Sequence, residues 1–185
     1  FQYFGGLLVP FLENLQYDKI SIYVGDLKKV KLSYENMILH LASGIHLKSY
    51  SFKKYKKKKE KDDNKTLPNI DFITSNPIKF KKLFSNFKAV SEGVFFARDL
   101  LHEPPNVLNP VNLASRAKEL SKLNVKVNIL DEKSMKKLGM GALLGVGMGS
   151  ANPSRLITLE WNGNPDSKSP PLGLVGKGVT FDSGG

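Results

Sequence analysis

A long stretch of helical periodicity near the middle of the chain limits the folds available to it. Apolar residues recur at helical spacing from Pro77 to about Leu101, and Pro104-Pro105 ends the pattern. A helix of this length exceeds the roughly 8–20 residues that are usual in globular proteins, and such a helix can join two domains. We therefore expect an N-terminal domain over residues 1–76, a linker helix over 77–101 and a second domain from residue 102 onward.

Segments typical of strands and helices alternate on both sides of this helix. Before it, we expect strands over 19–24 and 69–74 and, between them, a helix from Ser33 to about residue 47, with Ser33 as its N-cap. After it, we expect a helix over 110–123, strands over 125–130 and 155–161, a short helix capped by Asp131, a buried run over 142–146 and a strand over 172–175. This alternation predicts an α/β fold built in layers.

The charge is concentrated in one short tract. The net charge is +11, and between Lys53 and Lys65 eight lysines stand against three acidic residues. Blocks of like charge are usually solvated loops. The alternative is a basic nucleic-acid-binding module in which Lys56, Lys57, Lys58 and Lys59 contact phosphates. Aromatic residues that could stack on bases are not interleaved with these lysines.

The composition excludes several classes of protein. With no cysteine, the chain has no disulfide framework, no thiolate zinc site and no cysteine nucleophile, and this suits a reducing cytosol. Its apolar runs are far shorter than the roughly 20 residues that a membrane helix needs, and no secretory signal is visible. We expect a cytoplasmic protein without a membrane partner. Because the first residue is Phe1, the true N-terminus is expected to lie elsewhere.

The last eleven residues, VGKGVTFDSGG, place Lys177 after an apolar run and Asp182 five positions later. Ligands bind outside the carboxyl ends of strands in open α/β sheets. A phosphate loop does not fit, because Pro171 stands where the motif needs glycine and Gly178 stands where it needs Ser or Thr. A dinucleotide fingerprint over 145–149 fails as well, because its third glycine comes too early.

A metal site is the remaining chemical option for this pair. A carboxylate is a hard oxygen ligand for Zn²⁺, Mn²⁺ or Mg²⁺. An amine binds a metal only when it is deprotonated, and desolvation or a neighbouring cation lowers the pKa of a lysine. The spacing alone also suits a surface lysine at a strand end and an aspartate in a turn, so both interpretations stay open at this point.

Four stretches resemble the leucyl aminopeptidases, also called cytosol aminopeptidases, of the M17 peptidase family. Residues 175–185 resemble the first metal-binding signature of that family. Residues 97–106 are similar to its interdomain segment and residues 137–150 to the start of its catalytic domain. Residues 42–44 and 47–56 resemble a weaker pattern in its N-terminal domain.

The resemblance implies a fold, an activity and two ligands. The fold is a macro-domain-like N-terminal α/β domain, a linking helix and a C-terminal α/β catalytic domain that begins at about residue 102. The activity is the removal of N-terminal residues, often leucine, from peptides with a free N-terminus, and it uses two divalent ions, Zn or Mn. Lys177 matches the lysine that binds the second metal, and Asp182 matches the aspartate that bridges both. The family assembles as a homohexamer.

The resemblance also shows what these 185 residues do not contain. The catalytic lysine of the family lies just past the position of Asp182, and its catalytic arginine and remaining metal carboxylates lie farther on, beyond Gly185. We therefore expect no catalytic residue here, a chain that is part of a longer protein, and no turnover by this chain alone. His102 matches no family ligand and is interpreted as structural.

Overall fold

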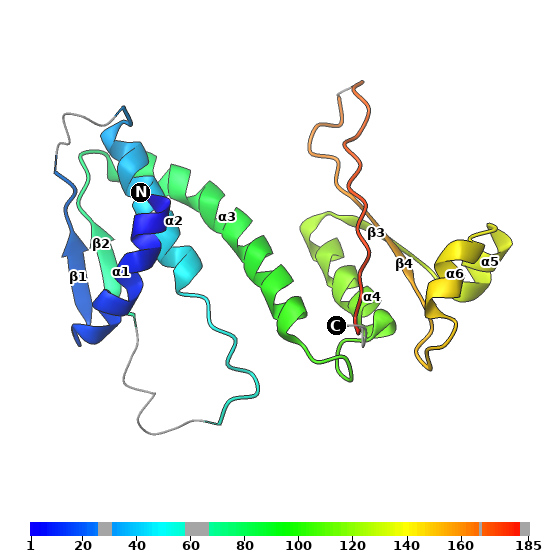
Figure 1. The fold of residues 1–185 in the computed structure, drawn as a ribbon. Coiled ribbons are helices and arrows are strands. Elements are labelled where there is room, and N and C mark those ends of the chain that lie inside the picture. Colours follow the sequence, from blue (N-terminus) through cyan, green and yellow to red (C-terminus); the bar gives the residue numbers. More distant parts are fainter. Residues whose placement is uncertain (26–30, 58–66, 167, 182–185) are drawn as a thin grey trace. The chain divides into compact units, whose positions relative to one another are not determined.

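The computed structural model describes residues 1–25, 31–57, 67–166 and 168–181 (Figure 1). The chain forms two compact units, Phe1–Leu101 and His102–Gly185. Helices and strands occur in both units, which confirms the predicted α/β class. None of the helices in the described ranges combines the length and the apolar character that a membrane crossing needs.

The first unit is a β-α-β arrangement with an additional helix at each end. Its elements are α1 (Gln2–Asn14), β1 (Lys19–Ile22), α2 (Tyr34–Lys48), β2 (Asn69–Phe72) and α3 (Pro77–His102). The two strands pair in parallel, with Lys19 opposite Asn69 and Ile22 opposite Phe72. The predicted strands and helices are confirmed to within two residues at each end. The exception is α1, which the sequence did not predict.

The core of the first unit lies where α1, α2 and one face of the sheet meet. Val9 and Leu12 of α1 are buried against Leu41 and Ile45 of α2. In both strands, exposed residues alternate with half-buried ones, so that each strand turns one side toward this cluster. The half-buried strand residues in contact with the cluster are Ile20, Ile22, Ile70 and Phe72. Parallel strands with a helical connection are usually covered in this way.

Glycines bring α1 and α2 into direct backbone contact. A Cβ atom added to Gly44 would collide with the carbonyl of Gln2 and lie 3.0 Å from the backbone nitrogen of Gly6. A Cβ atom added to Gly5 would collide with the carbonyl of Leu41 and lie 3.2 Å from the Cα of Gly44. The two helices therefore cross at a point where neither helix has room for a Cβ atom.

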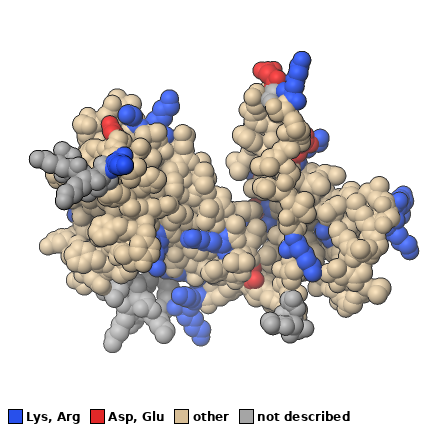
Figure 2. Space-filling view, turned by 45° about the horizontal axis from the view of Figure 1, so that its top comes forward, with Lys and Arg blue, Asp and Glu red and all other residues tan. Residues whose placement is uncertain are grey.

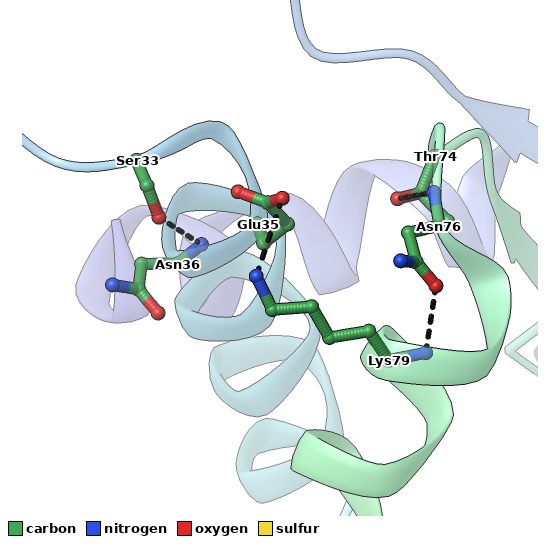
Figure 3. Close-up of polar contacts among 6 residues, drawn as sticks. All are labelled: Ser33, Glu35, Asn36, Thr74, Asn76 and Lys79. Carbon is green, nitrogen blue, oxygen red and sulfur yellow. Dashed lines mark hydrogen bonds and ion pairs between the residues drawn. The ribbon is translucent and has the colours of Figure 1, made fainter.

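Local hydrogen bonds fix the beginnings of α2 and α3 (Figure 3). Ser33 Oγ accepts the Asn36 N–H at 3.3 Å, which confirms the predicted N-cap of α2. Asn76 Oδ1 accepts the Lys79 N–H at 3.0 Å at the first turn of α3. The Lys79 ammonium lies 3.6 Å from the Glu35 carboxylate and so joins the two helix ends. Hydrogen bonding to its backbone amide, and secondly this ammonium, hold the pKa of Glu35 below its usual value.

The second unit contains α4 (Pro110–Lys118), the 3₁₀ helix η1 (Glu119–Leu123), β3 (Lys126–Leu130), α5 (Glu132–Lys137), α6 (Gly141–Gly147) and β4 (Leu156–Glu160). The two strands pair antiparallel, from Lys126 opposite Glu160 to Leu130 opposite Leu156. Asp131 accepts the Ser134 N–H at 2.8 Å, which confirms the predicted cap of α5. The buried apolar residues of this unit are Leu108, Ala114, Ala117 and Met135.

Two predictions about the second unit were wrong. Residues 142–146 are not a buried run but lie in α6, where none of them is buried. Residues 172–175 form no strand, and Leu172 and Leu174 are 87% and 90% exposed. A strand requires hydrogen-bonded neighbours, and among the described residues β3 and β4 pair only with each other. A short apolar run does not by itself show which partner it has.

The glycine contact between α1 and α2 predicts an unusual response to alanine. We expect Gly44→Ala to lower the free energy of unfolding by about 1–3 kcal/mol, because the added methyl group overpacks the crossing. Alanine has a higher helix propensity than glycine, so propensity alone would predict a gain in stability rather than this loss. Urea denaturation of the 185-residue chain measures this difference.

Gly93→Ala is the matched control. Gly93 lies inside α3, and a Cβ atom there would meet no other atom within 4 Å. We expect this substitution to raise the free energy of unfolding by up to about 1 kcal/mol. A stabilising effect of alanine at both positions would contradict the close crossing of α1 and α2.

Candidate functional site

Lys177, the first predicted metal ligand, lies in a segment of the second unit that is neither helix nor strand. This C-terminal part of the chain is drawn in red in Figure 1. Its carbonyl accepts the Val179 N–H at 3.1 Å, and this bond bends the chain around Gly178. A Cβ atom at Gly178 would lie 3.2 Å from Leu113 Cδ2 of α4, so the segment passes close to that helix. The side chain of Lys177 is exposed. The bend and the contact with α4 thus hold the backbone of a lysine whose amine reaches solvent.

Asp182, the second predicted ligand, lies outside the described residues, as do residues 183–185. The structure therefore describes one of the two proposed ligands. Within the described ranges, no three His, Asp or Glu side chains gather closely enough to hold a metal ion. Lys177 alone supplies one nitrogen donor, which is too few for a metal centre. The pairing of Lys177 with Asp182 stays a prediction.

Several acidic side chains of the second unit stabilise local structure. Hydrogen bonds from Ser134 lower the pKa of Asp131, which caps α5. Glu132 Oε1 accepts the Ser154 N–H at 2.8 Å. Glu160 lies 3.0 Å from the Lys126 ammonium across the strand pair, and both side chains are exposed. These three carboxylates thus have structural partners within their own unit.

The predicted nucleic-acid surface is described only in part. Lys53, Lys54, Lys56 and Lys57 are exposed, whereas Lys58, Lys59 and the rest of the tract lie outside the described residues. The Lys54 ammonium lies 5.4 Å from the centre of the Tyr55 ring. In the face shown in Figure 2, the lysine and arginine side chains of the described residues are spread over the surface. Binding of nucleic acid through this tract stays a prediction.

A polar and aromatic cluster joins the C-terminal end of α2 to α3. Arg98 Nη1 donates to the carbonyl of Leu47 at 3.1 Å, and the Tyr50 hydroxyl donates to Asp99 Oδ1 at 2.8 Å. The Arg98 guanidinium also lies 5.4 Å from the centre of the Tyr50 ring. Both bonds lie within the first unit. Partners 49 and 51 residues apart leave no local signal in the sequence.

The histidines have different surroundings. His40 is exposed on α2. His46 is half-buried near the end of α2 and packs against aromatic rings of α3. His102 is exposed at the last position of α3. None of the three belongs to a group of potential metal ligands among the described residues.

The catalytic-domain model of the cytosol aminopeptidase family, the M17 peptidases, matches residues 95–185. This range begins in α3 and covers the second unit, including the segment that carries Lys177. The match relates this range to the catalytic domain of that family. Together with the relatives described next, it shows that the chain belongs to the cytosol aminopeptidase family.

Curated relatives extend the similarity over almost the whole chain. The probable cytosol aminopeptidase of Sinorhizobium medicae strain WSM419 is 50% identical over 147 residues, which are 78% of this chain and 29% of the relative. That of Rhizobium johnstonii is 49% identical over 183 residues, which are 98% of this chain and 36% of the relative. The chain thus spans about a third of the length of these relatives.

Solved structures share the fold. A mutant of tomato leucine aminopeptidase superposes with a TM-score of 0.73 at 25% identity, over 85% of this chain and 32% of that protein. The bottromycin maturation enzyme BotP, solved in complex with Mn, superposes with a TM-score of 0.69 at 20% identity, over 86% of this chain and 33% of that protein. The second likeness shows the fold alone.

The Tyr50–Asp99 bond predicts a loss of stability in alkaline solution. Burial, and then the hydrogen bond to Asp99, raises the pKa of Tyr50 above its usual value. The stability that the neutral phenol contributes is therefore present below about pH 10 and is lost as the pH rises through the higher pKa of the folded state. We expect Tyr50→Phe to reduce the fall in the urea midpoint between pH 8 and pH 11.

Tyr17→Phe is the control, because Tyr17 is 65% exposed. Deprotonation of lysines affects both variants in the same way, so the difference between them isolates Tyr50. Equal pH dependence in the two variants would exclude a special contribution from the Tyr50–Asp99 bond.

Proposed function

We propose that the protein is a metal-dependent aminopeptidase that hydrolyses the N-terminal residue, preferentially leucine, from peptides. The observation that carries this proposal is the match of residues 95–185 to the catalytic domain of the cytosol aminopeptidases. Relatives at 48–50% identity bear the name of the same activity. Because the chain spans about a third of their length, the activity is proposed for the whole protein.

Lys177 and Asp182 are the residues that we propose as metal ligands. The described chain leaves the amine of Lys177 accessible. Asp182 supplies a carboxylate, which is the oxygen donor that Zn²⁺, Mn²⁺ and Mg²⁺ accept and which can bridge two ions. Two divalent ions would polarise the scissile carbonyl and lower the pKa of a water molecule. BotP, which shares the fold, was solved with Mn, and this favours a divalent metal without identifying it.

The chemistry of Lys177 requires a neutral amine. An ammonium group has no free electron pair, so Lys177 must lose its proton before its nitrogen can bind a metal ion. Positive charge near the amine and removal of water both favour the neutral form. We infer that the role of Lys177 depends on neighbours brought to the 177–182 segment when the site is complete. Arginine at this position would stay charged and could not replace lysine as a ligand.

We also propose the arrangement of the whole protein. Residues 1–76 would form the N-terminal domain, residues 77–101 the linker helix and residues 102–185 the start of the catalytic domain. The relatives are about three times as long as this chain, which leaves room for the remaining catalytic residues. Peptides with a free N-terminus would be the substrates, and the protein would act in the cytoplasm as a homohexamer.

The function is tested on the protein that the complete reading frame encodes. We expect it to release the amino acid from a leucyl amide, to lose activity on chelation and to regain it with Zn²⁺ or Mn²⁺. Asp182→Ala should lower kcat/KM at least about a hundredfold, because a metal centre supplies several kcal/mol of transition-state stabilisation. Metal content measured on the same preparations should fall together with the activity.

Asp166→Ala provides the matched control, since Asp166 is an exposed aspartate in the same unit. It should keep the metal content and the activity of the wild type. A wild-type enzyme that is indifferent to chelation, or an Asp182→Ala variant with full activity, would contradict the proposal. The 185-residue chain alone serves as a further control, and we expect it not to hydrolyse the leucyl amide.

A further inference from the structure

One titratable side chain outside the proposed site has an unusual environment. His46 lies near the end of α2, and its Nε2 atom is completely buried without a hydrogen-bond partner among the described residues. Buried polar atoms normally have such a partner. If the imidazole is neutral and Nε2 is unprotonated, this nitrogen lacks the one hydrogen bond that it could accept. An imidazolium would carry a charge and an N–H donor there with nothing to receive it.

Aromatic rings of α3 surround this imidazole. The centre of the Phe95 ring lies 5.1 Å from that of His46, and the planes are tilted by 48°. The Phe84 ring meets His46 edge-on at 6.0 Å and 70°. Phe95 in turn stacks on Tyr50 at 5.2 Å, next to the Tyr50–Asp99 bond. The neutral imidazole of α2 thus packs against the apolar rings of α3.

The charged groups around His46 oppose protonation on balance. Burial is the first cause that lowers the pKa of His46, and the positive charge of Lys88 on α3 is the second. Glu92 acts in the opposite direction, but its carboxylate lies 3.9 Å from the Lys88 ammonium.

On the sheet side, Asp71 lines the neighbouring cavity and forms an ion pair with Lys19 at 2.6 Å. Arg98 of α3 is bonded to the Leu47 carbonyl.

A cavity beside the imidazole offers a second position for the side chain. It has a volume of about 670 Å³ and is lined by His46 and Ser49 of the α2 end, Asp71 of β2, and Phe80 and Phe84 of α3. A protonated imidazole that rotated into this space would gain water as a hydrogen-bond partner. It would also leave its packed position against Phe95.

We propose that His46 is an acid-sensitive contact, and that its protonation releases the C-terminal turn of α2 from α3. The neutral side chain packs against Phe84 and Phe95, whereas the cationic side chain moves into the solvated cavity. Phe95 is also the first residue of the catalytic-domain match, so the contact acts on the helix that leads into that domain. The proposal concerns the first unit and does not depend on the proposed peptidase activity.

The direction of the pH effect follows from the lowered pKa of His46. A histidine that resists protonation in the folded state contributes stability above the pKa of the unfolded chain, which is about 6.5. This contribution is lost as the pH falls from about 6.5 through the lower pKa of the folded state. One proton taken up on unfolding changes the folding equilibrium constant by at most about tenfold per pH unit.

The experiment combines variants with direct titration of the full 185-residue chain. Urea unfolding between pH 7.5 and pH 5 should show a loss of stability in the wild type that His46→Phe removes. His40→Gln is the matched control, because His40 is an exposed histidine of the same helix, and it should keep the wild-type pH dependence. Hydrogen exchange, corrected for intrinsic rates, should increase at pH 5.5 over residues 44–49 and 84–98.

NMR titration of the wild-type histidines keeps the test decisive even when His46→Phe fails to fold. The imidazole of His46 should titrate below the ordinary histidine value of about 6.5, with the signals of Phe84 and Phe95 shifting at the same midpoint. A His46 midpoint at or above about 6.5 would overturn the proposal. Equal pH dependence in wild type and His46→Phe would overturn it as well.

Discussion

The close crossing of α1 and α2 is the constraint on which the first unit depends. Gly5 and Gly44 allow the two backbones to touch, and this contact brings Val9 and Leu12 onto Leu41 and Ile45. Packing of apolar side chains at native density is sensitive to a single methyl group. Both strands turn their half-buried residues toward the same cluster. Any change that separates α1 from α2 would therefore also remove the cover of the sheet.

Helix α2 connects this core to α3 through two different kinds of contact. At its beginning, Glu35 and Lys79 form an ion pair between neighbouring helix ends. At its end, Arg98 satisfies the carbonyl of Leu47, one of the last carbonyls that a helix leaves without an internal partner. The ion pair is partly exposed and contributes little, whereas the cluster at the far end combines hydrogen bonds with stacked rings. The alignment of α3 depends mainly on that cluster.

The sequence predicted features that are local and missed features that need distant partners. Ser33 and Asp131 cap helices through side chains three residues away from their bonded amides, so their roles follow from short patterns. The long helix α3 was predicted because its apolar periodicity continues over many turns. Helix α1 was missed, because Gly5, Gly6 and Pro10 are poor helix formers and only packing against α2 compensates for them.

The same distinction applies to the candidate site. The motif that contains Lys177 and Asp182 could be found in the sequence, because its residues lie within a few positions of each other. The strand predicted for 172–175 was wrong, because apolar character does not supply a pairing partner. Tyr50 and Asp99 lie 49 residues apart, so neither residue indicated the other. His46 gave no sign of its burial for the same reason, since its aromatic neighbours are supplied by α3.

The chemical identity of the site rests on whether Lys177 and Asp182 bind metal together. The most direct measurement is a crystal structure of the protein encoded by the complete reading frame, grown with Mn²⁺ and phased at the manganese absorption edge. We expect an anomalous peak within about 2.0–2.3 Å of both the Lys177 Nζ atom and an Asp182 carboxylate oxygen. Anomalous peaks found only elsewhere, with Lys177 and Asp182 facing solvent, would contradict this expectation.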